Sequence, residues 1–212
     1  MDNVWSSITP SDYDAHMAHP QVAQIQLLTA IIGEQLALCA NGCAAILGIT
    51  NGSGLEYVAA SGIEKLIGID INEAFLQECR VRFPDLGERL ELIPMDLMTE
   101  STKAADILAP CGLIIADLLI SHIHLDNFMK IVAGLPHHQQ IVSCVIQVNP
   151  DGVIVSQSGF EHVFDDVVAH MEEEAESLLT AAMTSAGFAL CGRTVYDLPN
   201  QKQFVRLDYA AS

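Results

Sequence analysis

The amino-acid sequence predicts an α/β fold: a doubly wound, mostly parallel sheet of seven strands that ends in an antiparallel hairpin. Short apolar segments alternate with stretches in which apolar residues recur every three or four positions, the pattern of strands that alternate with helices. The short segments are apolar throughout, as expected for strands that helices cover on both faces. The last two segments alternate loosely and flank Pro199-Asn200, which indicates the hairpin.

The first half of the chain shows this alternation clearly. Apolar residues at spacings of three and four from Val22 to Leu38 predict an amphipathic helix. Gly62 and Pro84 are typical of positions where helices stop, and they set the ends of the next two helices. The expected elements are a helix at 20–40, a strand at 44–47, a helix at 55–61, a strand at 65–70, a helix at 71–83 and a strand at 90–93.

The second half continues the pattern. The segment 141–148 is rich in β-branched residues, which favour strands. Ala186-Gly187 ends a long helical pattern. The expected elements are a strand at 112–116, a helix at 120–133, a strand at 141–148, a helix at 164–185 and hairpin strands at 188–198 and 203–209. Because no linker or repeat divides the chain, we expect a single domain over 1–212.

Composition argues against several classes of function. Nine basic against 27 acidic residues give a formal charge of −18, and the basic residues are scattered, whereas affinity for nucleic acid needs clustered Lys or Arg. No apolar stretch is long enough for a membrane span, and the start has no secretory signal pattern. Six cysteines without paired spacing fit a reducing compartment. We therefore expect a cytoplasmic protein that binds neither nucleic acid nor membrane; its oligomeric state has no signal in the sequence.

A Gly-rich turn, Gly48-Ile49-Thr50-Asn51-Gly52-Ser53-Gly54, follows the first strand and precedes a helical segment. Glycine lets a backbone approach a ligand closely, and a helix start favours anionic groups. By itself this turn also suits a tight strand-to-helix connection without a ligand. The turn therefore marks a candidate cofactor loop that needs further support.

Two acidic residues supply that support. Asp70 ends the second strand, where it can accept hydrogen bonds from ribose hydroxyls, and Asp96 follows the third strand. Because the carboxyl ends of parallel strands meet at one edge of a sheet, both acids are expected beside the Gly-rich turn. Ligands of open α/β sheets bind at that edge.

With these features the chain resembles the class I S-adenosylmethionine-dependent methyltransferases, over roughly residues 43–210. That family has a Rossmann-like core, a Gly-rich loop after the first strand, acids after the second and third strands, and a terminal antiparallel hairpin. The resemblance implies a core at 41–212 and an N-terminal helical cap at 1–40 over the active site. It also implies S-adenosyl-L-methionine as methyl donor. The compact size of the chain favours a small molecule as acceptor, and we expect no metal.

The resemblance also assigns cofactor contacts. The loop would line the methionine part of the cofactor, Asp70 would hold the ribose hydroxyls, Ile71 would pack on the adenine, and Asp96 would contact the adenine amino group. Ala116 follows the fourth strand, where the family faces the sulfonium. The implied cofactor-binding residues are Gly48, Thr50, Asn51, Gly52, Gly54, Asp70, Ile71, Asp96, Leu97 and Ala116.

Two departures from the family pattern keep alternatives open. Gly48 stands where the family usually has an acid, and Thr50 replaces the first glycine of the loop. A non-catalytic protein that binds S-adenosylmethionine or S-adenosylhomocysteine is therefore one alternative. An NAD(P)-dependent oxidoreductase is another, although Tyr57 stands where its Gly-rich pattern needs a small residue.

Methyl transfer needs positioning and, for some acceptors, a general base. Candidate catalytic residues are Asp117 and His122, near the fourth strand, and His16, whose imidazole suits neutral pH. Tyr13, His16 and Gln157 are candidates for the acceptor pocket. His122, His124 and Asp126 are not expected to bind a metal, because positions two apart on a helix face different directions.

Overall fold

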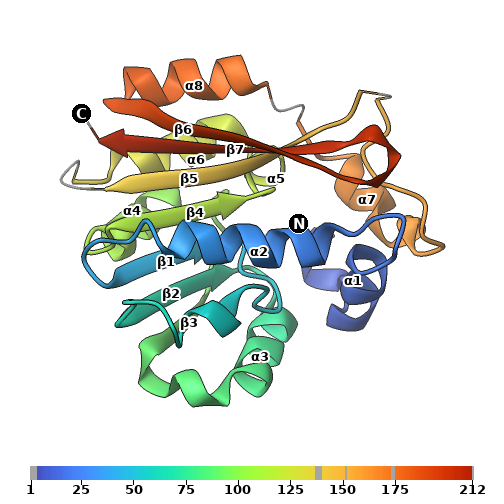
Figure 1. Ribbon diagram of the computed structural model, residues 1–212, viewed down its shortest axis with the longest axis horizontal. Coiled ribbons are helices and arrows are strands. Elements are labelled where there is room, and N and C mark those ends of the chain that lie inside the picture. The colour runs from blue at the N-terminus through green and yellow to red at the C-terminus, as the bar shows by residue number, and fades with distance from the viewer. Residues whose placement is uncertain (1–3, 137–139, 151, 173–174, 212) are drawn as a thin grey trace.

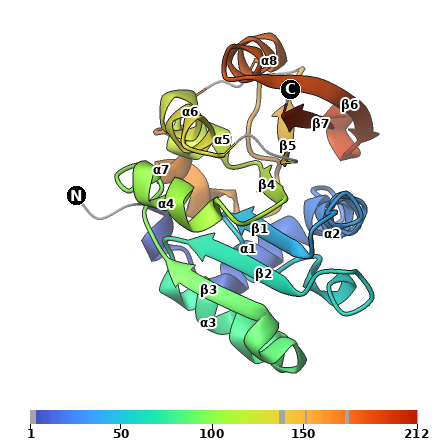
Figure 2. The same cartoon turned by 90° about the vertical axis from the view of Figure 1, so that its left-hand side faces the viewer.

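The computed structural model describes residues 4–136, 140–150, 152–172 and 175–211. Its centre is a sheet of seven strands in the order β3-β2-β1-β4-β5-β7-β6 (Figures 1 and 2). The first five strands of the chain pair in parallel, and β7 pairs antiparallel with both β5 and β6. The doubly wound, mostly parallel sheet and the terminal hairpin predicted from the sequence are confirmed.

All seven strands lie where the sequence pattern predicted them. Ile141 to Val148 of β5 pair with Ala210 to Gln203 of β7, so the hairpin joins the sheet through its second strand. The strands are β1 (Cys43–Leu47), β2 (Lys65–Asp70), β3 (Leu90–Pro94), β4 (Leu113–Asp117), β5 (Ile141–Val148), β6 (Phe188–Asp197) and β7 (Gln203–Ala211).

The helices connect these strands on both sides of the sheet. The α-helices are α1 (Pro10–Met17), α2 (Gln24–Leu36), α3 (Glu73–Arg82), α4 (Ser101–Leu108), α5 (Ile120–Ile123), α6 (Leu125–Ala133), α7 (Asp165–Val168) and α8 (Glu176–Ser185). Short 3₁₀ turns are η1 (Val4–Ser7), η2 (Leu55–Tyr57), η3 (Pro84–Arg89), η4 (Glu161–Phe164) and η5 (Pro199–Gln201). Thr9 caps α1, because its side chain accepts a hydrogen bond from the Asp12 amide.

The predicted helix at 55–61 is wrong. Only the single 3₁₀ turn η2 forms there, with the amides of Tyr57 and Val58 bonded to the carbonyls three residues earlier. Leu55 and Val58 are both fully buried. A spacing of three between buried positions fits a 3₁₀ turn as well as an α-helix, so the apolar pattern did not distinguish the two.

The two long helices predicted in the second half are also wrong, because each is interrupted. His124 has a φ of 68°, a left-handed conformation that separates α5 from α6. In the second case α7 ends at Val168 and α8 starts at Glu176. Between them the Glu172 amide donates to the Ser121 carbonyl of α5, so the backbone there leaves the helical path.

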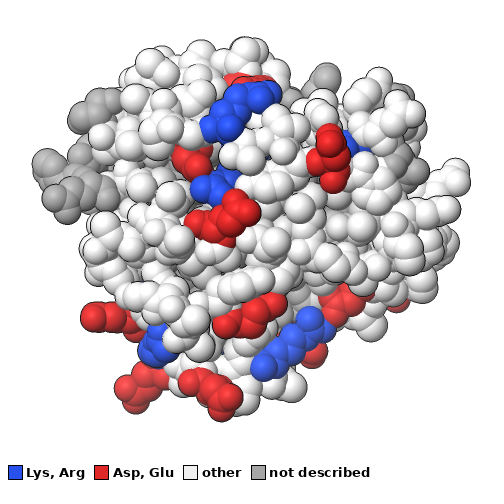
Figure 3. Space-filling view, in the orientation of Figure 1, with Lys and Arg blue, Asp and Glu red and all other residues white. Residues whose placement is uncertain are grey.

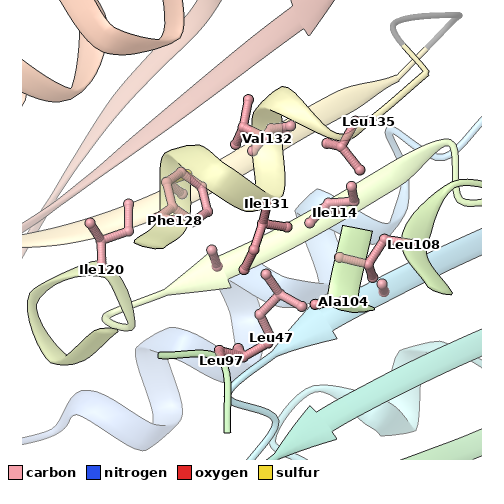
Figure 4. Close-up of a cluster of buried hydrophobic side chains, with 14 of the residues drawn as sticks. Leu47, Leu97, Ala104, Leu108, Ile114, Ile120, Phe128, Ile131, Val132 and Leu135 are labelled. Atoms are coloured by element: carbon pink, nitrogen blue, oxygen red, sulfur yellow. The ribbon is translucent and has the colours of Figure 1, made fainter. Parts of the chain in front are cut away.

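Helices α4, α6 and α8 cover one face of the sheet, and α2 and α3 cover the other (Figure 2). Alternate residues of β1 divide between these layers: Ala45 and Leu47 face the first, Ala44 and Ile46 the second. Figure 4 shows the first layer, where Phe128 and Ile131 of α6 pack over Ile114 of β4. The two layers fix the strands, so the loops at their carboxyl ends have a rigid base.

The surface carries mixed charges. On the face in Figure 3, Lys and Arg side chains lie apart from one another, with acidic side chains beside them. No helix in the described ranges combines the length and the apolar character that a membrane span requires.

Candidate functional site

A cavity of about 630 Å³ opens at the carboxyl edge of the sheet, around the ends of β1 and β4. This is where the strand order reverses direction, since β1 continues to β2 on one side and β4 to β5 on the other. Ligands of open α/β sheets bind at such a point, in cavities of about 300–1,000 Å³. Ten of the residues predicted for a site line it: Tyr13, His16, Gly48, Thr50, Asp70, Ile71, Asp96, Leu97, Asp117 and His122.

The Gly-rich turn forms one wall. Its backbone is in the left-handed region at Gly48, Thr50, Gly52 and Gly54, with φ between 49° and 86°. Thr50 is the unusual member, because a β-branched side chain rarely takes a positive φ. Such strain persists only where neighbouring contacts enforce it, and it is concentrated at functional sites.

Asp70 supplies one of those contacts. Its Oδ2 accepts a hydrogen bond of 2.8 Å from the Thr50 amide, and its Oδ1 accepts one of 2.8 Å from the Asn72 amide. Burial raises the pKa of this carboxyl to about 6, while the hydrogen bonds from the backbone oppose the rise. Asp70 therefore holds the turn in place and still presents lone pairs to the cavity, which it lines.

Gly52, Gly54 and Asn51 lie behind this wall and do not line the cavity. A Cβ at Gly54 would lie 2.6 Å from Ile32 Cβ on α2, and one at Gly52 would lie 2.9 Å from Leu55 and Phe83. Asn51 is fully buried and donates to Asp14 of α1. The two glycines thus allow close packing of the turn against helices, and Asn51 attaches the turn to α1.

The neighbouring lobe of the cavity is apolar with one acid. Ile71, Met95 and Leu97 contribute apolar surface. Asp96 Oδ1 accepts a 2.9 Å hydrogen bond from the Met98 amide, which fixes the carboxyl at the mouth of the loop after β3. This combination suits a flat ring system with polar edges.

Asp117, at the end of β4, carries the most perturbed carboxyl of the site. Gln35 Nε2 of α2 donates to Asp117 Oδ1 at 2.8 Å and to Ser143 Oγ at 2.9 Å. Ser143 in turn donates to Asp208, which pairs with Arg206. Asp117 Oδ2 is buried and has no hydrogen-bond partner within the described ranges. Burial raises the pKa of Asp117 to about 7.

Residues of the N-terminal segment, among them Trp5, Tyr13 and His16, line the cavity. Asn72 Nδ2 donates to the carbonyls of Trp5 and Ile8, each at 2.8 Å, and so fastens this segment to the end of β2. Asp14 of α1 bonds to both Asn51 and Arg82, which attaches α1 to the Gly-rich turn and to α3. Residues from the start of the chain are thereby placed over the ends of the strands.

Aromatic rings line the roof. Tyr13 is buried, and the centroid of its ring lies 5.2 Å from that of Phe75. Burial raises the pKa of the Tyr13 hydroxyl. His16 Nδ1 lies 2.7 Å from Ser158 Oγ, and its ring lies 4.7 Å from that of Phe164. Burial lowers the pKa of His16. These residues bring α1 and the segment after β5 together above the cavity.

His122 of α5 faces the same space. Its ring meets Trp5 edge-on at 4.8 Å. Burial lowers the pKa of His122 to about 4, so the imidazole is neutral at physiological pH. A neutral imidazole can accept a proton or a hydrogen bond from a ligand, which is compatible with the role expected from the sequence.

Besides Asn51, Gly52 and Gly54, two further predicted residues lie outside the cavity. Gln157 is exposed, and the neighbouring Ser156 lines the cavity in its place. Ala116 is fully buried in the layer beneath, because its side chain alternates with that of Asp117 along β4.

The structure adds residues that the sequence analysis missed, above all Trp5, Gln35 and Phe164. Gln35 had a signal: it follows Leu28, Ile31 and Ile32 at helical spacing, so a polar residue occupies a buried position. Trp5 and Phe164 had none, since a single aromatic residue is usually a packing residue.

Among the described residues, no group of three or more His, Cys, Asp or Glu side chains is placed to hold a metal ion. His124 Nδ1 lies 3.0 Å from a carboxyl oxygen of Glu172, and His124 Nε2 lies 3.3 Å from the His170 carbonyl oxygen. These contacts connect the loop after α7 to the end of α5.

No protein-family model and no curated protein matches the sequence. Solved structures do match. The chain aligns over 100 % of its length with 98 % of the magnesium protoporphyrin IX methyltransferase of Synechocystis PCC 6803 with bound SAM, at a TM-score of 0.66 and 12 % identity.

Two proteins of Burkholderia thailandensis are also similar. The 1,6-didemethyltoxoflavin-N1-methyltransferase with bound S-adenosylhomocysteine gives a TM-score of 0.64 and 15 % identity over 96 % of this chain and 87 % of that one. An O-methyltransferase family protein gives 0.64 and 15 % over 88 % of this chain, which spans only 56 % of that one. This likeness confirms the predicted fold, the Rossmann-like fold of S-adenosylmethionine-dependent methyltransferases.

Proposed function

We propose that this protein is an S-adenosylmethionine-dependent methyltransferase that acts on a small molecule. One observation carries the proposal: a single cavity at the switch point of a methyltransferase-type sheet is lined by both Asp70, at the end of β2, and Asp117, at the end of β4, whose Oδ2 is buried without a hydrogen-bond partner among the described residues. The first acid suits a nucleoside, and the second suits a group that donates a proton.

The residues present fit the methyl donor. Asp70 offers lone pairs to ribose hydroxyls. Ile71 and Leu97 offer apolar surface to the adenine, and Asp96 would accept a hydrogen bond from its amino group. Gly48 and Thr50 would contact the methionine part. The carboxylates at the site also favour a sulfonium cation over a neutral product.

We also propose that residues 1–40 act as the cap over this site. The attachments of Trp5 and Ile8 to Asn72, and of Asp14 to Asn51, support this. A cap of this kind excludes water and positions the acceptor. Tyr13 and His16 would face the acceptor from α1.

Bound S-adenosylmethionine would supply an electrophilic methyl group for in-line displacement. Asp117 would take the proton that the acceptor loses, because a carboxyl with a pKa near 7 is partly ionised at neutral pH and is a better base than an ordinary carboxylate. Gln35 holds Asp117 Oδ1 and leaves Oδ2 without a partner among the described residues. His122 and His16, both kept neutral by burial, would accept hydrogen bonds on the opposite side.

A methyltransferase and a non-catalytic binder of the same cofactor share all the cofactor contacts. A turnover assay separates them. S-adenosylhomocysteine release from S-adenosylmethionine is measured with pools of small acceptors, for the wild type and Asp117→Asn. We expect release that depends on an acceptor and falls about 100-fold in the variant, the usual effect of a lost general base. Tight cofactor binding without release in any pool would favour the binder.

The oxidoreductase alternative has a structural argument against it. The Tyr57 ring packs against Gly33 of α2, within 2.8 Å of where a Cβ would lie. A dinucleotide-binding turn needs a small residue at that position for close helix–strand packing. We therefore expect NAD to bind far more weakly than S-adenosylhomocysteine.

A further inference from the structure

The acceptor end of the cavity, defined here by Trp5, His16, Asp117, His122, Phe164 and Met171, has walls of a particular kind. Trp5 and His122 meet edge-to-face at 4.8 Å, and Trp5 and Phe164 lie 6.4 Å apart. Ring clusters of this type bind flat, apolar bodies through large contact areas. The shape and chemistry of the walls favour a ring-bearing acceptor.

Charge at this end has one sign. Among the residues that the structure describes, the acidic side chains that line the cavity are Asp70, Asp96, Asp117 and Glu172. All nine Lys and Arg residues of the chain lie within the described ranges, and none of them lines the cavity. An anion placed there would lose water without gaining a positive partner, which is costly. The formal charge of −18 adds to this repulsion.

Lys202 is the cation whose charge acts on His16, and it is already engaged. Its side chain is buried, and Nζ donates to the carbonyls of Val153 and Ile154 at 2.5 and 2.9 Å. Lys202 therefore supports the loop after β5 from behind the cavity lining.

The imidazoles do not replace the missing cations. Burial lowers the pKa of both His16 and His122, so both rings are uncharged at neutral pH. Each can offer at most a neutral hydrogen bond. Positive counter-charge for a carboxylate or phosphate is thus absent from the lining formed by the described residues.

The hydrogen-bonding state of Asp117 Oδ2 favours a ligand group that donates a hydrogen bond. This oxygen is buried, it has no partner within the described ranges, and its carboxyl is held by Gln35. A buried acceptor without a partner is costly; because Asp117 lines the cavity, a ligand N–H or O–H that the carboxyl turns to meet would satisfy it.

Resting on the methyltransferase function proposed above, we propose that the acceptor is a small, non-anionic molecule with an apolar ring and an amine or hydroxyl group whose hydrogen Asp117 Oδ2 accepts. Carboxylates and phosphates are excluded as acceptors. Amines bind best, because a protonated amine also gains from the acidic lining.

The test uses the only tryptophan of the chain, Trp5, as a fluorescent reporter at the acceptor end. The full chain is saturated with S-adenosylhomocysteine and titrated with three probes of matched body: phenethylamine, 2-phenylethanol and 3-phenylpropionate. We expect the amine and the alcohol to bind at least about tenfold more tightly than the carboxylate, the effect of an unpaired buried charge. A carboxylate that binds as tightly as the amine overturns the proposal.

Two Asp→Asn variants make the test specific. Asp117→Asn should weaken the binding of phenethylamine about tenfold or more. The affinity for S-adenosylhomocysteine should stay within about twofold, because the substitution removes only the carboxylate that pairs with the acceptor. Asp126→Asn, an exposed carboxyl on α6 outside the cavity, should change neither. An Asp117→Asn protein that keeps the wild-type preference contradicts the proposed role of Oδ2.

A third variant tests the charge argument by gain. Met171 lines the acceptor end and is only partly buried, so Met171→Lys can place a cation there with its stem on apolar surface. We expect it to strengthen 3-phenylpropionate about tenfold. If the wild-type chain does not bind S-adenosylhomocysteine at all, the proposed function is contradicted. A separate titration of the wild type with S-adenosylhomocysteine therefore distinguishes failure of the proposed function from failure of the acceptor proposal.

Discussion

Gln35 Nε2 donates a 2.8 Å hydrogen bond to Asp117 Oδ1, so a helix on one face of the sheet orients the carboxylate at the end of β4. Gln35 is fully buried and also donates to Ser143, which continues the network to Asp208 and Arg206. The position of the proposed base is therefore set by a polar network that crosses the protein interior behind the cavity.

Gln35→Leu should lower both stability and activity. The substitution leaves Ser143 and Asp117 without a donor, and buried groups that lose a partner cost about 1–3 kcal/mol each. Urea unfolding measures the stability effect. Gln26→Leu is the matched control, because Gln26 is exposed on the same helix and should change stability by less than about 0.5 kcal/mol.

The same variant should shift the pH profile of turnover. The hydrogen bond from Gln35 lowers the pKa of Asp117, so its removal should move the acid limb of the rate profile to higher pH. The wild-type rate should rise as the pH passes through about 7. An unmoved limb would mean that Gln35 has only a structural role.

Asp117→Asn should change how stability depends on pH. Burial raises the pKa of Asp117 from 3.8 to about 7, so the folded protein holds this proton more tightly than the unfolded chain. The stability that the protonated Asp117 contributes to the folded protein is fully present below pH 4 and is lost as the pH rises to 7. The melting temperature of the variant relative to wild type should therefore be higher at pH 8 than at pH 4.5.

The lowered pKa of His122 makes stability depend on pH in the opposite sense, so His122 has to be present in both proteins that are compared. Its pKa is lowered to about 4, so its contribution is lost as the pH falls from 6.5 toward 4. Because His122 is unchanged in both proteins, the difference between their melting temperatures isolates Asp117. A difference that does not vary with pH would contradict the raised pKa.

Gly54→Ala should destabilise the fold. Gly54 has a φ of 84°, and a Cβ there would lie 2.6 Å from Ile32 Cβ, so α2 would have to move. Left-handed backbone and overpacking together cost about 2–5 kcal/mol. Chemical denaturation gives the value. Gly62→Ala is the control, since no atom lies within 4 Å of its Cβ position; equal losses at the two sites would refute the packing argument.

All seven strands could be predicted from the sequence: the parallel strands from short apolar runs, and the hairpin strands from loose alternation around Pro199-Asn200. The same pattern also placed Asp70, Asp96 and Asp117 at one edge, since the carboxyl ends of parallel strands meet there. Periodicity could not reveal where helices break. The break at His124 depends on a single left-handed residue, and that between α7 and α8 involves a tertiary contact of Glu172.

Side-chain direction was the other limit. The Gly-rich turn was expected to contact the cofactor along its whole length, but Gly52 and Gly54 face Leu55 and Ile32, and the cavity is lined by Gly48, Ile49, Thr50 and Ser53. A local pattern identifies a turn, whereas its two faces are decided by the helices that pack on it. Gln157 differs from Ser156 for a similar reason: the loop after β5 has no periodicity from which to read direction.

The measurement that tests the central claim most directly is a calorimetric titration of the full chain with S-adenosylhomocysteine, repeated for Asp70→Asn. The Asn side chain has one oxygen acceptor where Asp70 has two, so it cannot reproduce both hydrogen bonds from the backbone N–H groups of Thr50 and Asn72. The variant should therefore lose order in the turn as well as a ribose contact. We expect one-site binding with a dissociation constant on the order of micromolar, about −8 kcal/mol, weakened at least tenfold in the variant. No heat at millimolar S-adenosylhomocysteine, or saturable binding of NAD instead, would contradict the account.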